Sequence, residues 1–211
     1  MIKNIIFDFG GVLLDLDYNL TYKKMSEITG LEISEDTFPP SIIKVMMTYE
    51  KGQINTETFL WNLQKESSKL PPQAIDLIKA WNAMLLGWNK ERFQFLRELK
   101  KDYSLYLLSN TNELHIDWVM KDLEENHLIS DFDNHFFDKT YYSHLINKRK
   151  PDTEIYKFVL EDAGIKASET LFIDDNLNNV EAARKCGIHA IQHESGKEII
   201  EELPKYLKQV S

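Results

Sequence analysis

The sequence predicts an α/β protein with a Rossmann-like parallel sheet core and an inserted helical cap domain. Three observations lead to this prediction. Several short apolar runs end abruptly in polar residues, as the buried strands of a parallel sheet do. From residue 89 onward helical and strand patterns alternate, which is typical of βαβ units. Between residues 17 and 88, by contrast, the patterns are helical only.

The first strand is predicted at residues 5–7, an Ile-Ile-Phe run without polar alternation. Asp8 follows at the end of this strand, and in open α/β sheets ligands bind at the carboxyl ends of strands. Gly10 and Gly11 then let the backbone turn tightly and approach a ligand closely. Taken alone, Asp8 could be a nucleophile, a metal ligand or a helix cap.

A run of helices is expected next, with no strand period across it. Because the segment is too long for a simple crossover, we interpret residues 17–88 as a helical cap domain. Residues 1–16 and 89–211 then form the α/β core domain. The expected helix signals are a stop at Gly30, a cap at Ser41, a stop at Gly52, a start at Thr56, and a last helix after Pro71-Pro72 that carries Ile75, Ile78 and Trp81.

Four further strands are predicted after residue 89. The one at 105–110 ends in Ser109 and Asn110, and the one at 171–175 ends in Asp174 and Asp175. A basic loop that contains Lys150 leads into the helix before the latter strand. The other predictions are strands at 136–142 and 188–191, helices at 112–126 and 178–185, and a polar helical tail.

Composition limits the partners and the compartment. The net charge of −9 over 211 residues argues against a nucleic-acid partner, because such proteins normally present a basic face. The single cysteine, Cys186, excludes an internal disulfide, which is typical of a reducing compartment. The chain starts without a signal-peptide pattern, and no apolar stretch approaches the roughly 20 residues of a membrane span. We expect a cytoplasmic monomer or homodimer without a membrane partner.

Polar side chains of complementary kinds follow three of the predicted strands, and the basic loop can return to the same edge of the sheet. Carboxylates near one point repel each other and attract a cation, and hard oxygen ligands suit Mg²⁺. A metal and a lysine neutralise phosphoryl oxygens, to which a serine hydroxyl can donate. An aspartate placed there can attack phosphorus. The residues are Asp8, Ser109, Asn110, Lys150, Asp174 and Asp175.

With these motifs in this order, the sequence resembles the haloacid dehalogenase (HAD) superfamily over nearly its whole length. The helical segment matches the superfamily's helical cap, which directly follows the first motif. Within the superfamily the sequence resembles bacterial α-D-glucose-1-phosphate phosphatases. The motifs are Phe7-Asp8-Phe9-Gly10-Gly11-Val12-Leu13, Leu108-Ser109-Asn110, Arg149-Lys150-Pro151 and Phe172-Ile173-Asp174-Asp175-Asn176.

The resemblance implies a Mg²⁺-dependent phosphatase that cleaves a small phosphorylated metabolite, with a sugar phosphate as the expected substrate. Asp8 would be the nucleophile, carrying an aspartyl-phosphate intermediate, and also a Mg²⁺ ligand. The backbone carbonyl of Gly10 would be a second ligand, and Asp175 would complete the set, directly or with Asp174 through water. The phosphoryl group would be held by Ser109, Asn110 and Lys150.

One position departs from the family pattern. Phosphatases of the superfamily usually carry a second Asp two residues after the nucleophile, which protonates the leaving group and then activates water, a role worth about 10²–10⁴-fold. Gly10 occupies that position here. Asp15 or Asp17 could substitute for the missing acid, although capping of the first cap helix is the simpler expectation.

This departure leaves two alternatives to a phosphatase. Metal-independent 2-haloacid dehalogenases of the superfamily also lack the second Asp, although the acidic pair Asp174-Asp175 argues against a metal-free site that binds a carboxylate. Loss of the acid–base residue could also leave a catalytically weak phosphate-binding module. Metal dependence tests the first alternative, and ligand binding without turnover would indicate the second.

Overall fold

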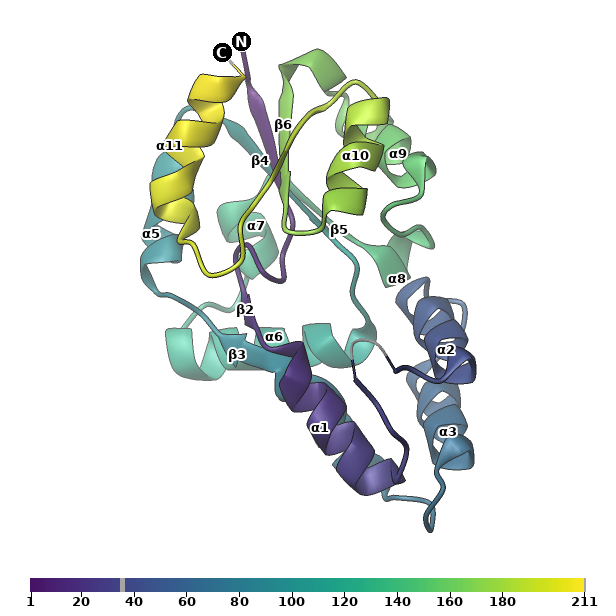
Figure 1. Cartoon of the computed structure of the whole chain (residues 1–211). Helices are drawn as coiled ribbons and strands as arrows, with labels where there is room; N and C mark the ends of the chain where they lie inside the picture. Colours follow the sequence, from purple (N-terminus) through teal and green to yellow (C-terminus); the bar gives the residue numbers. More distant parts are fainter. Residues whose placement is uncertain (35–36, 211) are drawn as a thin grey trace.

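The computed structural model describes residues 1–34 and 37–210, and its centre is a five-stranded parallel sheet (Figure 1). The strand order β5-β4-β1-β6-β7 places β1 in the middle, between β4 and β6. This sheet confirms the predicted fold class. The strands are β1 (Asn4–Phe7), β4 (Ser104–Ser109), β5 (Lys139–Tyr142), β6 (Thr170–Asp174) and β7 (His189–Gln192).

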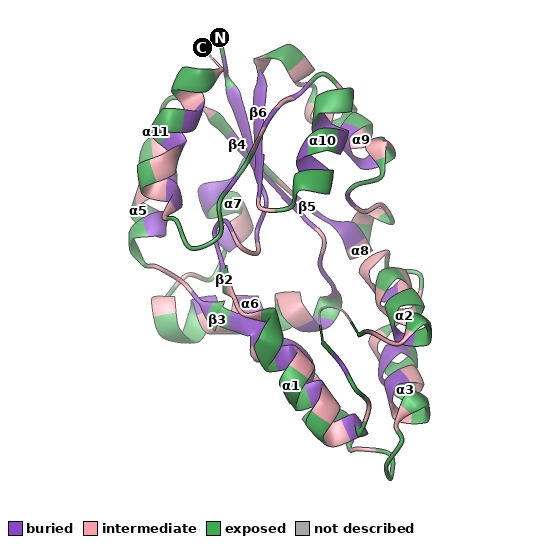
Figure 2. Ribbon diagram, viewed as in Figure 1, coloured by how far each residue is buried: buried purple, intermediate pink, exposed green. Residues whose placement is uncertain are grey.

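Apolar side chains alternate between the two faces of the sheet, and both faces are covered by helices. In β1, Ile5 and Phe7 pack into one apolar cluster and Ile6 into the other. The central strand β1 and its neighbour β6 are therefore buried at every residue, whereas the edge strands β5 and β7 are partly exposed (Figure 2). Helices α5 (Glu91–Leu99), α6 (Glu113–His127), α7 (Phe132–Phe136) and α11 (Ile199–Gln209) contribute to the first cluster, and α9 (Thr153–Ala163) and α10 (Leu177–Lys185) contribute to the second.

The helices between residues 17 and 88 bury their apolar side chains mainly against one another. Their cluster includes Phe59, Leu77 and Trp81, and Leu114 of α6 joins it from the core side. We keep the division into a cap domain and a core domain as a proposal. The helices are α1 (Tyr18–Thr29), α2 (Pro40–Glu50), α3 (Thr56–Glu66) and α4 (Ala74–Trp81), followed by a 3₁₀ turn at Asn82–Met84.

One prediction for this segment is wrong, because a short strand lies at its end. Strand β3 (Leu85–Gly87) pairs antiparallel with β2 (Asp15–Leu16), so the two chain passages between the sheet and the helices run side by side. Strands of two and three residues are too short to show the apolar–polar alternation by which a strand is recognised in a sequence. This two-stranded ribbon fixes where α1 begins.

Four local details also differ from the sequence-based expectations. Ser41 does not cap α2, which starts after Pro39, and its hydroxyl instead donates to Glu66 at 2.7 Å. Ile75 is 55% exposed, since α4 turns Leu77 inward. The predicted strand at 136–142 starts only at residue 139, because α7 precedes it. The expected polar tail is amphipathic: α11 buries Ile199, Leu203 and Tyr206.

Candidate active site

Asp8 lies at the centre of the sheet's carboxyl edge, directly after β1. Its backbone N–H donates to the carbonyl of Ile173 in β6 at 2.8 Å, which continues the strand pairing by one residue. Its side-chain Oδ1 accepts a hydrogen bond from the backbone N–H of Phe9 at 2.7 Å. With only 8% of the residue exposed, this carboxylate has a fixed position at the base of the site.

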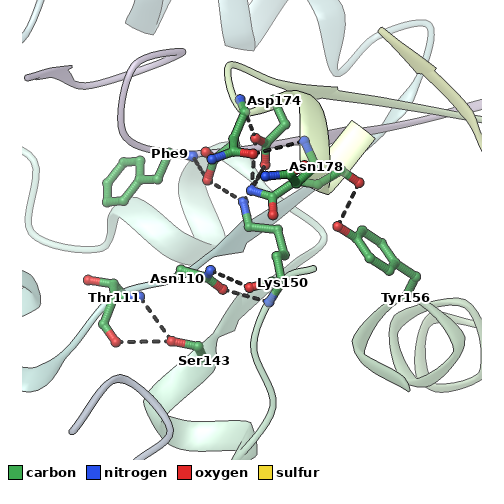
Figure 3. Close-up of polar contacts among 11 residues, drawn as sticks. Phe9, Asn110, Thr111, Ser143, Lys150, Tyr156, Asp174 and Asn178 are labelled. Carbon is green, nitrogen blue, oxygen red and sulfur yellow. Dashed lines mark hydrogen bonds and ion pairs between the residues drawn. The ribbon is translucent and has the colours of Figure 1, made fainter. Parts of the chain in front are cut away.

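Lys150 bridges two of the carboxylates. Its Nζ lies 2.6 Å from Oδ1 of Asp8 and 2.6 Å from Oδ2 of Asp174. Asn110 holds the lysine backbone from both sides, because its Oδ1 accepts from the Lys150 N–H at 2.8 Å and its Nδ2 donates to the Lys150 carbonyl at 2.9 Å (Figure 3). The side chain of Asn110 thus sets the place of the ammonium group.

Asp174 is completely buried and its two carboxylate oxygens accept several hydrogen bonds. Oδ1 accepts from the backbone N–H of Asn176 at 2.8 Å, and Nδ2 of Asn179 donates to Oδ1 at 3.0 Å and to Oδ2 at 3.1 Å. Tyr156 in turn donates to the carbonyl of Asn179 at 2.8 Å (Figure 3). Asp174 is therefore held rigidly behind the site rather than facing the pocket.

Asp175 completes the acidic group. One carboxylate oxygen from each of Asp8, Asp174 and Asp175 can be chosen so that all three lie within 4.8 Å of one another. Gly11 makes this approach possible: its φ is +77°, and a Cβ there would lie 2.4 Å from Oδ2 of Asp175. The backbone after Asp8 can thus pass directly against the third carboxylate only with a glycine at this position.

The excess negative charge of this cluster of three acids favours the binding of a cation. Burial, and then repulsion by Asp174, raises the pKa of Asp8 to about 8, although Lys150 acts in the opposite direction. Burial and Asp174 also raise the pKa of Asp175. Burial lowers the pKa of Lys150, but attraction to Asp174 and Asp8 more than offsets it and keeps the ammonium charged. Three acids thus face one ammonium, and oxygen donors in this arrangement fit a divalent hard cation.

A pocket of about 610 Å³ opens above the acids, between the sheet edge and the helical segment. The structure brings all the predicted site residues together: Asp8, Gly10, Ser109, Asn110, Lys150 and Asp175 line the pocket floor, and Asp174 lies directly behind them, in contact with Lys150. The opposite wall includes Tyr18, Tyr22, Glu50 and Trp81. Glu50 of α2 accepts from Arg149, next to Lys150, at 2.9 Å, and so joins the two walls.

The two acids considered as substitutes for the missing second Asp are engaged elsewhere. Asp17 lines the pocket but caps α1, since its Oδ1 accepts from the Asn19 N–H at 3.0 Å. Contrary to the expectation from the sequence, Asp15 does not cap the helix. It lies in β2 and accepts from Nη1 of Arg92 at 2.7 Å.

Sequence reasoning missed several pocket residues, among them Tyr18, Trp81 as a wall residue, and His115. The ring of His115 stacks on Trp81 with 5.3 Å between centroids, and its Nδ1 lies 3.2 Å from Nδ2 of Asn112. Burial lowers the pKa of His115 to about 4, so it is neutral at pH 7. These residues come from different helices, and no local motif signals that they converge.

A family model of haloacid dehalogenase-like hydrolases matches residues 2–187. The chain belongs to this family. The D-ribitol-5-phosphate phosphatase of Bacteroides thetaiotaomicron is 28% identical over 96% of this chain and 97% of its own length. The phosphorylated carbohydrates phosphatase of Thermotoga maritima is 23% identical over 89% of this chain and 82% of its own length. The predicted superfamily and the predicted enzyme class, a HAD-like phosphatase, are thereby confirmed.

Solved structures agree with this assignment. A HAD family enzyme of Bacteroides thetaiotaomicron, in complex with magnesium and inorganic phosphate, is 33% identical, covers 94% of this hydrolase and 97% of its own chain, and superposes with a TM-score of 0.83. A 2-haloacid dehalogenase from Pseudomonas syringae shares the fold alone, with 16% identity over 100% of both chains and a TM-score of 0.62. The more specific likeness to glucose-1-phosphate phosphatases stays a prediction. Among the described residues of this hydrolase, no helix has the length and apolar character needed to cross a membrane.

Proposed function

We propose that this chain is a Mg²⁺-dependent phosphatase that hydrolyses the phosphate monoester of a sugar or sugar alcohol through an aspartyl-phosphate on Asp8. The proposal rests mainly on the cluster of three carboxylates at the base of the pocket, which the buried ammonium of Lys150 contacts. Family membership supports hydrolysis, and two relatives are named for the phosphates of ribitol and of carbohydrates. A cytoplasmic monomer or homodimer stays part of the proposal.

The acids would hold the cofactor. Mg²⁺ is bound by carboxylates, carbonyls and water, and the solved relative carries this ion together with phosphate. We assign Asp8, Asp175 and the backbone carbonyl of Gly10 as protein ligands. Because donors from Lys150 and Asn179 already engage its oxygens, Asp174 would act through water. When bound, the ion balances the excess negative charge and polarises the phosphoryl oxygens.

Each side chain at the base of the pocket would have a separate role in the reaction. Lys150 and the Phe9 N–H both contact Oδ1 of Asp8, which leaves Oδ2 to attack phosphorus. Ser109, at the end of β4, would donate to a phosphoryl oxygen, and Lys150 would neutralise the charge that develops there. The bond from phosphorus to the leaving oxygen breaks as the bond to Asp8 forms, and water then releases phosphate from Asp8.

The upper wall of the pocket suits a polyhydroxylated leaving group. Glu50 and Arg149 offer an acceptor and donors for hydroxyl groups, while the rings of Tyr18 and Trp81 offer faces against which a carbon skeleton can pack. Closure of the helical segment over such a substrate would exclude water from the acids. We therefore place substrate choice in the segment 17–88.

Phosphate release from a substrate panel tests this proposal. D-ribitol 5-phosphate, glucose 1-phosphate, glucose 6-phosphate and p-nitrophenyl phosphate would be compared in Mg²⁺ buffer, with chloride release from 2-haloacids measured in parallel. We expect phosphate release, highest for a polyol or sugar phosphate. Chloride release without any phosphate release would instead favour the dehalogenase reaction, and inorganic phosphate binding without turnover would favour a binding module.

A further inference from the structure

The charged side chains on the pocket walls restrict the kind of leaving group that the pocket can take. Of the described residues that line the pocket, only Arg149 and Lys150 carry a positive charge. His115 is neutral at pH 7, because burial lowers its pKa to about 4. A second anionic group on a substrate would therefore depend on one of these two cations. The acids that line the same pocket are Asp8, Asp17, Glu50 and Asp175.

Lys150 cannot serve a second anionic group. Its Nζ lies 2.6 Å from a carboxylate oxygen of Asp8 and 2.6 Å from one of Asp174, and only 1% of its side chain is exposed. Under the proposed function its charge also acts on the transferring phosphoryl group, at the base of the pocket. A charge on the far end of the leaving group would have to find another partner.

Arg149 is neutralised by an ion pair with Glu50, the last residue of α2. Its Nε and Nη2 both donate to Oε2 of Glu50, at 3.2 and 2.9 Å. The two side chains are only 20% and 19% exposed, so water screens their attraction less than at the surface. Burial raises the pKa of Glu50, while the guanidinium acts in the opposite direction. The pair as a whole therefore has no net charge to offer to an anion.

The same ion pair can bind an uncharged hydroxyl group. Both hydrogen bonds from Arg149 use Oε2 of Glu50, which leaves Oε1 to accept from a hydroxyl of the substrate. A hydroxyl can donate to this oxygen, whereas a carboxylate or a second phosphate has no proton to donate at neutral pH and is repelled by it. A group that attracts one substrate and repels its charged analogue discriminates between them in both ways.

We propose that Glu50, through its ion pair with Arg149, selects phosphate monoesters with an uncharged leaving group over those whose leaving group carries a second negative charge. Sugar and polyol phosphates belong to the first class, and the phosphates of sugar acids belong to the second. The inference rests on the proposed phosphatase function and narrows its substrate class. At an effective dielectric constant of about 20, a like charge roughly 6 to 12 Å away weakens binding by about 10- to 100-fold.

A matched pair of substrates tests this role. D-ribitol 5-phosphate and D-ribonate 5-phosphate differ only at carbon 1, which is a hydroxymethyl group in one and a carboxylate in the other. We expect kcat/KM of the wild-type enzyme to be about tenfold or more higher for the polyol phosphate. The ratio of the two kcat/KM values is the readout, because a change that weakens catalysis alone lowers both values together.

Two variants change the net charge of the ion pair in steps. Glu50→Gln keeps the shape of the side chain but leaves the charge of Arg149 uncompensated. The ratio should then fall by about tenfold or more, through a gain on D-ribonate 5-phosphate. The double variant Glu50→Gln with Arg149→Gln removes both charges, so the pair is neutral again and the ratio should return toward the wild-type value. A ratio unchanged by Glu50→Gln would overturn the proposal.

Asp152→Asn is the matched control. Asp152 pairs with Lys51 at 3.0 Å, which links the end of α2 to the loop that carries Arg149, but neither Asp152 nor Lys51 lines the pocket. The variant removes a carboxylate from a contact of the same kind and should change the ratio by less than about twofold. An equal fall in the ratio with Asp152→Asn and Glu50→Gln would attribute selectivity to the attachment of α2 and overturn the role of Glu50.

The release of phosphate from p-nitrophenyl phosphate separates failure of this inference from failure of the proposed function. The two sugar-derived phosphates would also be compared as competitive inhibitors of that reaction. A wild-type enzyme that hydrolysed p-nitrophenyl phosphate but treated the two compounds alike would overturn the selectivity while leaving the phosphatase function intact. If it released phosphate from none of the three compounds, the proposed function would fail, and this inference with it.

Discussion

The Nζ atom of Lys150 lies 2.6 Å from Oδ1 of Asp8, and both groups are almost completely buried. The lysine comes from the loop before α9 and the aspartate from the end of β1, so the contact joins residues that are distant in sequence. This contact and the Phe9 N–H both use Oδ1, which leaves Oδ2 of the carboxylate for the attack on phosphorus that we propose. The nucleophile that we propose is thus oriented before substrate arrives.

Removing the lysine charge should destabilise the metal-free protein strongly. In Lys150→Met the carboxylates of Asp8 and Asp174 lose their buried counter-charge, and breaking such a pair typically costs about 3–5 kcal/mol. We expect a large fall in Tm in chelator and a partial recovery in Mg²⁺, together with loss of phosphatase activity. Lys148→Met, in the same loop, serves as the control. Equal Tm values for the two variants in chelator would contradict this account of the site.

Restoring an acid at position 10 should fail unless space is made for it. In Gly10→Asp the new Cβ meets Leu16, and overpacking of this kind typically costs about 1–3 kcal/mol. We expect the single variant to lose stability and activity. The double variant Gly10→Asp with Leu16→Ala should regain activity relative to the single one, with Leu16→Ala alone as its control. Chemical denaturation and turnover of D-ribitol 5-phosphate would be measured, and a single variant as stable as wild type would show that Leu16 moves aside freely.

His115 should contribute to acid sensitivity. Burial lowers its pKa from about 6.5 to about 4 in the folded protein. As the pH falls from about 6.5 to 4, the unfolded chain takes up a proton that the folded chain does not, so stability is lost in this window, by an amount on the order of 2–3 kcal/mol. His115→Phe should flatten the decline of unfolding free energy over that range.

Part of the decline in unfolding free energy should remain in His115→Phe, because two further histidines also have lowered pKa values. Burial also lowers the pKa values of His144 and His193. An unchanged slope in His115→Phe between pH 4 and 6.5 would mean that this ring does not titrate differently in the folded and unfolded chains.

Most of the floor of the site could be predicted from the sequence because most of its residues follow a strand. Apolar runs that end in Asp8, Ser109 and Asp174 place their polar ends on one edge of the sheet, whatever the exact packing of the helices. The upper wall could not be predicted. Tyr18 and Glu50 meet there only because α1 and α2 are folded back over the sheet edge, and that placement depends on packing within the segment and on the Glu50–Arg149 ion pair.

The ribbon of β2 and β3 is another element that could not be predicted from the sequence. Leu16 and Leu85 pair across it, yet two or three residues give no period from which a strand can be recognised. The capping role of Ser41 was mispredicted for a related reason. Pro39 and Pro40 already start the helix, and the serine hydroxyl has a better acceptor in Glu66 of the next helix.

Phosphate release by the wild-type enzyme and by Asp8→Asn, each with Mg²⁺ and with chelator, tests the central claim most directly. The asparagine has nearly the same shape as Asp8 but cannot form an aspartyl-phosphate. We predict release that requires Mg²⁺ and vanishes in the variant, while the variant remains folded by circular dichroism. Release that persists in Asp8→Asn, or that is unchanged in chelator, would contradict the assignment of Asp8 as the nucleophile of a magnesium-dependent phosphatase.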